Sequence, residues 1–377
     1  MNLLRQRIEQ EIRERGPIPF SRYMELCLYE PNLGYYSRSA EKFGKAGDFY
    51  TSSDVHAVFG RLLARQFEEM WRVLGSPARI DLIELGPGRG LFAQDVLAWS
   101  EKKFPDFFGC LRCILVERSS ALRKRIAENL DSHLASGRAI LKSDSARDLF
   151  AAEIPTIVFA NEFFDALPVE IVSERGSLRI NTDQGRFFEM WEPASSEEIE
   201  FLDRYSVHPE FDERIEVPLT AQQHIQQIAE GIGRGFVIIV DYGYTREEQL
   251  AGRHRGTLKA IRQHSISASP YEAPGEQDIT AHVNFTALAA AAEKHGMQIH
   301  KLVTQSQFLL GVGEANQFAD AFEESRLPQE RAKVALQLKH LVTPAGMGES
   351  FHVQVGYKGV AQAAIESLSG LSFGRNP

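Results

Sequence analysis

The chain has 377 residues, of which 43% are hydrophobic and 25% are charged, and its formal net charge at pH 7 is -9. This length and composition are sufficient for a large catalytic domain with additions. The acidic balance argues against a general nucleic-acid binder, whose affinity depends on clustered lysine and arginine. No apolar run is long enough to span a bilayer, so we expect no membrane insertion.

The amino-terminal end carries charges of both signs and has neither signal nor transit character, which predicts a cytoplasmic bacterial protein. The three cysteines of the chain are not spaced as zinc ligands are. We expect them to be small buried side chains in a reducing compartment. No spacing of histidine, cysteine and aspartate indicates a metal site.

Residues 1–78 are predicted to form a mostly helical region in front of the catalytic core. The first helix repeats an apolar residue at each turn, at Leu4, Ile8 and Ile12. Ser21 is a candidate cap of a second helix. A third helix, from about residue 55 to 71, carries a longer apolar stripe that is typical of core packing.

The segment 47–54, just before the third helix, has more polar side chains than one helix cap needs. We predict that it helps to close the site, with Asp48 and Thr51 as candidate cofactor contacts. The alternative is an ordinary polar loop.

The chain is organised around residues 80–90, where an apolar run too short for a helix predicts a buried strand. A glycine-rich turn follows, and a helix begins near Leu91. Leu91 stands where a dinucleotide-binding turn carries its third glycine, so a Rossmann dehydrogenase is the weaker alternative. The observed spacing is typical of class I S-adenosylmethionine (SAM) methyltransferases. It gives these candidate cofactor-binding residues: Glu84, Gly86, Pro87, Gly88 and Gly90.

The next strand, 111–117, ends in Glu117, where both NAD and SAM folds place the carboxylate that binds ribose hydroxyls. Together with the glycine turn, Glu117 makes SAM the favoured cofactor. Asp144 follows a short third strand and is a candidate contact on the adenine side, although an aspartate there is also a common helix cap.

The fourth strand, 156–160, leads into a loop with carboxylates, an amide and aromatic rings. Because ligands of open α/β sheets lie at the carboxyl ends of the strands, this loop should face the transferred methyl group. Glu162 and Asp165 could orient an amine or guanidinium, and Asn161 is a candidate contact of both acceptor and cofactor. The alternative is an aromatic pair in the core with Asp165 as a cap.

Later segments predict insertions and the end of the core. Residues 169–191 alternate like a β-ribbon, a helix and a fifth strand follow, and a long polar excursion, closed by 278–285, is a candidate lid. It contains His264 and His282, candidate general bases that are more often structural. We predict a core of residues 79–377, with insertions at about 170–232 and 244–284.

The chain resembles the MidA-like SAM-dependent methyltransferases over nearly its whole length. The resemblance rests on motifs at 29–36, 47–52, 84–90, 160–169, 241–243, 256–258 and 278–283. It implies a class I fold with a seven-stranded sheet. From the mitochondrial members, it also implies methylation of an arginine in a subunit of respiratory complex I.

We therefore expect in-line displacement of the sulfonium methyl group by an acceptor nitrogen, with positioning supplying most of the catalysis. The candidate catalytic residues are Asn161, Glu162, Asp165 and His282. A non-catalytic assembly factor that keeps SAM as a structural ligand is the main alternative. The expected partner is a protein substrate, and the oligomeric state stays open, with a homodimer as one option.

Overall fold

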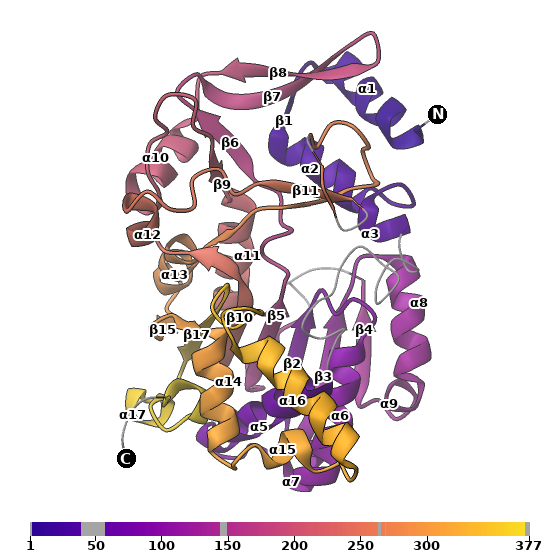
Figure 1. Cartoon of the computed structure of the whole chain (residues 1–377), viewed down its shortest axis with the longest axis vertical. Coiled ribbons are helices and arrows are strands. Elements are labelled where there is room, and N and C mark those ends of the chain that lie inside the picture. Colours follow the sequence, from indigo (N-terminus) through magenta and orange to yellow (C-terminus); the bar gives the residue numbers. More distant parts are fainter. Residues whose placement is uncertain (1, 39–56, 144–148, 263–264, 268, 374–377) are drawn as a thin grey trace.

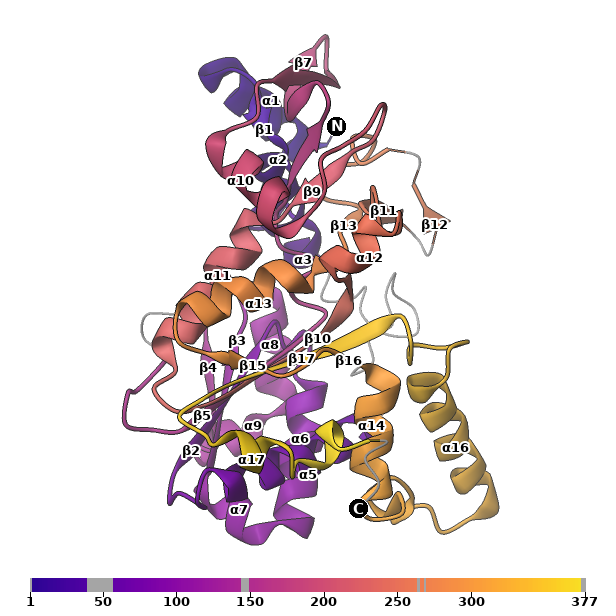
Figure 2. The ribbon, with the colours of Figure 1, turned by 90° about the vertical axis from the view of Figure 1, so that its left-hand side faces the viewer.

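The computed structural model describes residues 2–38, 57–143, 149–262, 265–267 and 269–373. They form two parts stacked along the long axis of the molecule, a core around a large sheet and a smaller module of strands and helices (Figure 1). The same division is visible from the side (Figure 2). None of the helices in these ranges combines the length and the hydropathy needed to cross a membrane.

The central sheet contains a continuous path of seven strands, which confirms the predicted α/β fold. β17 runs antiparallel to both of its neighbours, β10 and β15, whereas β10, β5, β2, β3 and β4 are mutually parallel. Two short strands extend the sheet, β14 (Val283–Asn284) on β10 and β16 (Val303–Thr304) on β17. The path runs through β15 (Gln298–Ile299), β17 (Phe351–Lys358), β10 (Gly235–Tyr244), β5 (Thr156–Asn161), β2 (Ile80–Leu85), β3 (Leu111–Val116) and β4 (Ala139–Lys142).

Helices cover both faces of this sheet, so every residue of β2 is buried. Ile80 and Leu82 pack into one hydrophobic cluster, and Ile83 and Leu85 pack into the cluster on the opposite face. The second face is covered by α11 (Leu219–Gly231) and α13 (Phe285–Lys294). The first is covered by α5 (Ala57–Val73), α6 (Leu91–Lys103), α7 (Pro105–Cys110), α8 (Ser120–Asn129), α9 (Asp131–Ala135), α14 (Gln305–Glu314), α15 (Ala319–Phe322), α16 (Pro328–Val342), α17 (Gln362–Ile365) and the 3-10 helix Ser369–Leu371.

The smaller module joins the amino-terminal helices to the predicted β-ribbon. Ile18 pairs with Ile180 across an antiparallel ladder, and the apolar faces of the first two helices pack on the same sheet. Its elements are α1 (Leu3–Arg15), β1 (Ile18–Pro19), α2 (Phe20–Tyr29), α3 (Tyr35–Arg38), β6 (Glu170–Ser173), β7 (Gly176–Asp183), β8 (Arg186–Glu192), α10 (Ser196–Tyr205) and β9 (Ile215–Val217).

The predicted helical region 1–78 is therefore divided between the two parts. The apolar stripe of α5 packs on α6 of the core, whereas α1 and α2 find their partners in β6 and β7. Ser21 does not cap α2, whose N-cap is Pro19; its hydroxyl donates instead to the carboxylate of Glu170 in β6.

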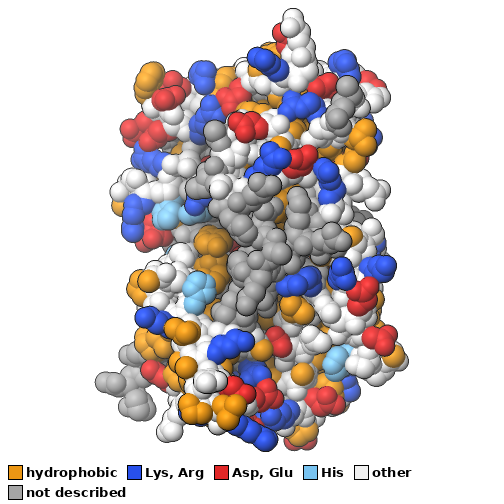
Figure 3. Space-filling model, turned by 45° about the vertical axis from the view of Figure 1, so that its right-hand side comes forward, with side chains coloured by type: hydrophobic (Ala, Val, Ile, Leu, Met, Phe, Trp, Pro, Cys, Tyr) orange, Lys and Arg blue, Asp and Glu red, His pale blue; other side chains and the backbone are white. Residues whose placement is uncertain are grey.

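The long excursion after β10 contains a three-stranded sheet of β12 (Ser265–Ile266), β11 (Lys259–Arg262) and β13 (Asp278–Thr280). A short helix, α12 (Arg246–Leu250), precedes it. On the face of the molecule shown in Figure 3, acidic and basic side chains are intermixed over both parts.

Candidate active site

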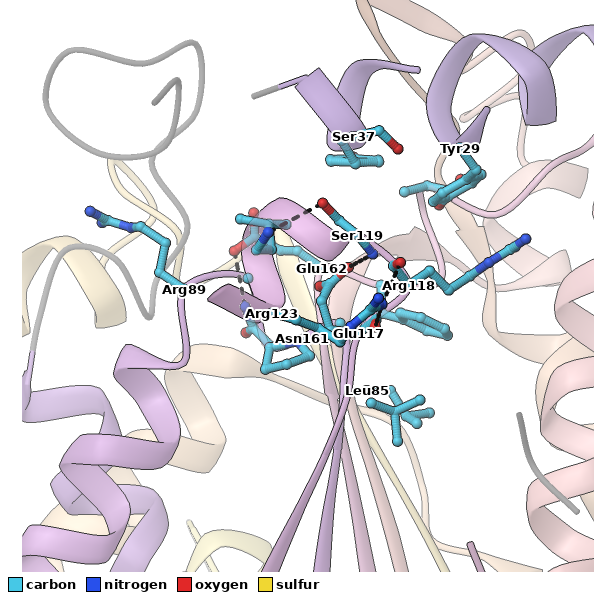
Figure 4. A pocket seen from close by; sticks show the side chains of 18 of the residues that line it. Tyr29, Ser37, Leu85, Arg89, Glu117, Arg118, Ser119, Arg123, Asn161 and Glu162 are labelled. Atoms are coloured by element: carbon cyan, nitrogen blue, oxygen red, sulfur yellow. Dashed lines mark hydrogen bonds between the residues drawn. The ribbon is translucent and has the colours of Figure 1, made fainter. Parts of the chain in front are cut away.

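A cavity of about 460 Å³ lies between the two parts, at the carboxyl ends of the core strands. Its floor comes from residues that follow β2, β3 and β5, and its upper wall comes from α2 and α3 (Figure 4). The size is that of a pocket for a drug-sized molecule. Parallel strands of an open sheet leave such a crevice where their ends diverge.

The glycine turn after β2 lines this cavity through Gly86, Pro87 and Gly88. Gly86 and Gly88 have φ values of 63° and 54°, in the left-handed region that favours glycine. A Cβ atom on Gly86 would lie 2.9 Å from the Phe163 ring, whereas one on Gly88 would meet no described atom within 4 Å. The backbone at Gly88 is therefore open to a ligand. Gly90, also predicted, lies outside the lining and begins α6 instead.

Glu117 reaches the cavity from the end of β3, as its position in the sequence predicts. Its carboxylate accepts a hydrogen bond of 2.7 Å from the backbone N–H of Ser119. The guanidinium of Arg123 donates to the carbonyl oxygens of Glu117 and Arg118, at 2.9 and 2.6 Å, and so fixes the turn (Figure 4). Burial raises the pKa of Glu117 to about 7.

Glu84 lies outside the lining of this cavity. It occupies the same face of β2 as Ile80 and Leu82, and burial raises the pKa of its carboxyl group to about 8. Among the described residues, its Oε2 has no hydrogen-bond partner. Burying a carboxyl group without a hydrogen-bond partner costs free energy, and an ammonium group on that side of the strand would lower this cost.

The loop after β5 presents Asn161, Glu162 and Phe163 to the cavity. The Asn161 amide donates to Glu162 Oε1 at 3.1 Å, and the Glu162 N–H donates to the carbonyl of Val240 in β10 at 3.0 Å. Glu162 has a φ of 50°, a strained value for a residue with a side chain. Strain of this kind persists only where the surroundings hold the backbone in place.

Asp241 supplies that constraint from β10, at the position just after the stretch that pairs with β5. Its Oδ2 accepts from the N–H groups of Phe164 and Asp165 at 3.0 and 3.2 Å, and its Oδ1 accepts from its neighbour Tyr242 at 2.9 Å. Burial raises its pKa to about 7, against the lowering effect of these donors. Burial, and then the charges of Asp241 and Glu162, hold the pKa of Asp165 well above its usual range.

The lining residues that were not among the predicted site residues include Tyr29, Tyr36 and Asp278. The Tyr29 hydroxyl donates to the carbonyl of Ala166 at 2.8 Å, and the Tyr36 hydroxyl donates to Asp278 Oδ1 at 2.9 Å. Both tyrosines and the aspartate stand in the motifs at 29–36 and 278–283. The signal was therefore present, but nothing in the sequence showed that these motifs meet at the site.

His282 lies outside the cavity lining. Its ring stacks on Tyr242 at 6.2 Å, and its Nδ1 is 3.3 Å from Nδ1 of His254. Burial, followed by the charges of Lys259 and two histidines, lowers its pKa to about 4. It is therefore neutral and a weak base at pH 7, and this placement gives no support to a role as general base.

Several predicted residues fall outside the described ranges. These are the candidate cofactor contacts Asp48, Thr51 and Asp144 and the candidate base His264.

The lining fits an adenosyl cofactor in its chemistry as well as its size. An open glycine backbone lies beside an acidic strand end, and apolar side chains complete that end of the cavity. A flat purine suits such an apolar wall, and a carboxylate such as that of Glu117 suits ribose hydroxyls. The apolar side chains are those of Val116, Leu122, Leu149, Phe150 and Ile228.

Comparison with known proteins agrees with this arrangement. A family model described as "Putative S-adenosyl-L-methionine-dependent methyltransferase" matches residues 62–303. A Drosophila melanogaster protein named protein arginine methyltransferase NDUFAF7 homolog, mitochondrial, is 30% identical over 406 residues, covering 98% of this chain and 88% of that protein. The human protein arginine methyltransferase NDUFAF7 is 27% identical over 372 residues, covering 91% and 80%.

Solved structures show the same similarity in three dimensions. A crystal structure from Burkholderia thailandensis bound to S-adenosyl-homocysteine has a TM-score of 0.83 and 28% identity, covering 99% of this chain and 95% of that chain. A native crystal structure from the same organism has a TM-score of 0.80 and 27% identity, covering 99% and 94%. S-adenosylhomocysteine is what SAM becomes when its methyl group has been transferred.

Proposed function

We propose that the chain, which belongs to this family of SAM-dependent methyltransferases, methylates a nitrogen of an arginine side chain in a protein. The names of its similar proteins from fly and human agree with this acceptor. The observation that carries the proposal is the concentration of carboxylates at one end of the cavity.

Glu162, Asp165 and Asp278 all line that end of the cavity. Buried carboxylates near one another are unfavourable unless a cation or protons compensate them, and the pKa of Asp165, held well above its usual range by burial and by the neighbouring carboxylates, expresses this cost. A guanidinium brings a delocalised positive charge and five N–H donors to such a site. An arginine acceptor therefore supplies what these side chains need.

The bound cofactor supplies an electrophilic methyl group on a sulfonium. The chain's own part is to place the acceptor nitrogen in line with that group and to receive the proton that the nitrogen loses as its bond to carbon forms. Glu162 is the carboxylate we assign to this proton. Asn161 holds one of its oxygens at 3.1 Å, which orients the other.

For the acceptor protein, we propose a subunit of respiratory complex I, which the resemblance to the mitochondrial members indicates. This assignment concerns the partner only, and the chemistry above is independent of it.

The test is transfer of a labelled methyl group from SAM to protein extracts of cells that lack this gene, followed by mass spectrometry of the labelled proteins. We expect methylarginine with the wild-type chain and none with Glu162→Gln, although that variant should bind SAM normally. Label on a different residue type would overturn the arginine assignment. SAM binding without transfer to any extract would favour the non-catalytic assembly factor.

A further inference from the structure

Asp278 forms part of the cavity wall that does not belong to the methyltransferase core. It is the first residue of β13, in the excursion after β10, and its side chain is buried. The hydroxyl that binds its Oδ1 belongs to Tyr36 of α3. The carboxylate is thus supplied by one peripheral segment and oriented by another, and neither segment belongs to the loop after β5.

The surroundings of Asp278 form an aromatic and acidic chamber. The rings of Tyr29 and Tyr36 lie 5.5 Å apart, with an interplanar angle of 32°. After burial, the charges of Asp278 and Asp165 are among the causes that raise the pKa of both phenols, and the charge of Asp278 also raises the pKa of Asp165. Such effects require these groups to lie within a short distance of one another.

The chamber is joined to the core loop through the backbone. The N–H of Ala281, three residues after Asp278, donates to the carbonyl of Asp165 at 2.9 Å. The hydroxyl of Tyr29 donates to the carbonyl of Ala166, the residue after Asp165. The segment that carries Asp278 and the loop that carries Glu162 are therefore held in one fixed relation.

Two carboxylates on separate segments match a guanidinium better than an ammonium. A guanidinium is planar, and its donors point outward along different edges, so two carboxylates can each bind a different edge. An ammonium is a compact, strongly hydrated charge and gains less from a second, separate carboxylate. The aromatic wall accepts a planar cation, since the guanidinium of Arg118 lies 5.6 Å from the centroid of the Tyr29 ring.

Resting on the proposed function, we propose that Asp278 is a specificity-determining residue. It binds the acceptor guanidinium from the side opposite the loop after β5 and thereby selects arginine over lysine. Tyr36 acts as a positioning residue that keeps the Asp278 carboxylate in place.

The experiment uses the full chain saturated with S-adenosylhomocysteine, with methylguanidinium and methylammonium as probes whose weak binding is measured by saturation-transfer NMR. Asp278→Asn is the main variant, because an asparagine keeps an acceptor oxygen for the Tyr36 hydroxyl while it removes the charge. Glu276→Gln is the matched control. Glu276 lies two residues earlier, outside the lining, and pairs with Arg262 at 2.9 Å.

We expect the wild type to bind methylguanidinium at least about tenfold more tightly than methylammonium. Asp278→Asn should weaken methylguanidinium binding about tenfold, the usual effect of losing a charged hydrogen bond, and leave S-adenosylhomocysteine affinity within about twofold. Tyr36→Phe should weaken methylguanidinium binding by a smaller factor. Glu276→Gln should match the wild type.

Wild-type preference for methylguanidinium that survives in Asp278→Asn would overturn the proposal. So would an equal loss in Glu276→Gln, or an equal loss of S-adenosylhomocysteine affinity in Asp278→Asn. Rejection of the role of Asp278 can be distinguished from failure of the proposed function. Extracts methylated on arginine by both wild type and Asp278→Asn, with the same KM, would retain the function and reject the role of Asp278.

Discussion

Glu162 has a carboxylate at the reacting end of the cavity and a strained backbone. Replacing it by glycine and by alanine removes the carboxylate in both cases, so the two variants differ only in the backbone strain. Glycine adopts a φ of 50° without strain, whereas alanine does not. We therefore expect Glu162→Gly to have a free energy of unfolding about 1 kcal/mol higher than Glu162→Ala, as measured by urea denaturation. Both variants should lose methyl transfer. If the alanine variant is as stable as the glycine variant, the strain is not stored at this residue.

Glu117 should control cofactor affinity in a pH-dependent way. Its pKa is raised to about 7 by burial, and ribose hydroxyls bind the ionised form. Affinity for S-adenosylhomocysteine should therefore rise as the pH rises from 6 to 8 and then level off. Glu117→Gln should bind more weakly and show little of this dependence.

Calorimetric titration at several pH values measures this effect. The exposed Glu128→Gln in α8 is the control and should behave as the wild type. A Glu117→Gln variant with wild-type affinity would remove Glu117 from the cofactor site.

At the level of single residues, the sequence placed at the cavity those residues that stand at or just after the end of a strand. Gly86, Gly88, Glu117, Glu162 and Asp165 all line the cavity. A strand end is visible in a local apolar pattern, and the sheet then brings such ends together. Tyr36 and Asp278 were missed as site residues because they are 242 positions apart and meet only through the tertiary fold.

At the scale of elements, the backbone of the loop after β5 is held in place by the side chain of Asp241 in β10. Asp241→Asn is expected to replace an acceptor oxygen by an amide that cannot accept, opposite the N–H groups of Phe164 and Asp165. Methyl transfer should fall by about tenfold or more, because small misplacements of reacting groups are costly, while S-adenosylhomocysteine affinity should change little.

Amide hydrogen exchange supplies the diagnostic readout for Asp241→Asn. The N–H groups of residues 164 and 165 should exchange faster in the variant, and those of β2 should not. Unchanged exchange at 164 and 165 together with lost activity would mean that Asp241 acts in another way.

The core strands β2, β3, β4, β5 and β10 followed from short apolar runs, and the ribbon of β6, β7 and β8 in the smaller module followed from its alternating pattern. Helix α10 was not predicted, although Ser195 and Glu198 form a capping box at its start. The short helix α7 begins with a proline and spans only six residues, too few for a periodic signal.

At the scale of the whole molecule, several buried carboxyl groups set a dependence of stability on pH. Burial raises the pKa values of Glu84, Glu117 and Asp241 to about 8, 7 and 7. A carboxyl whose pKa is higher in the folded than in the unfolded chain favours folding while it is protonated, and this advantage is lost as the pH rises through the folded value.

The free energy of unfolding of the ligand-free protein should therefore fall by an amount on the order of a few kcal/mol between about pH 5 and pH 8. Denaturant titrations at constant ionic strength measure it. Glu84→Gln should flatten the decline in the upper part of this range. A ligand-free protein whose stability rises over the same range would contradict the assignment.

The packing of α1 and α2 on the β-ribbon could not be predicted from the sequence, for a physical reason. Amphipathic helices such as α1 and α2 indicate that they have an apolar face but not which surface covers it. Their cover is β7, more than 150 residues further along the chain, whereas the nearby α5 packs elsewhere. Local patterns therefore indicate the helices α1, α2 and α5 but not which surface each of them packs on.

This long-range pairing has a consequence during synthesis. α1 and α2 leave the ribosome well before the strand that buries Ile18 and the apolar faces of both helices, since that strand begins only at Gly176. At typical elongation rates, these faces wait on the order of ten to thirty seconds for their partner. The nascent chain thus exposes an apolar amino-terminal segment while the core strands β2, β3, β4 and β5 are translated, and we expect chaperones that bind at the ribosome exit to recognise this segment.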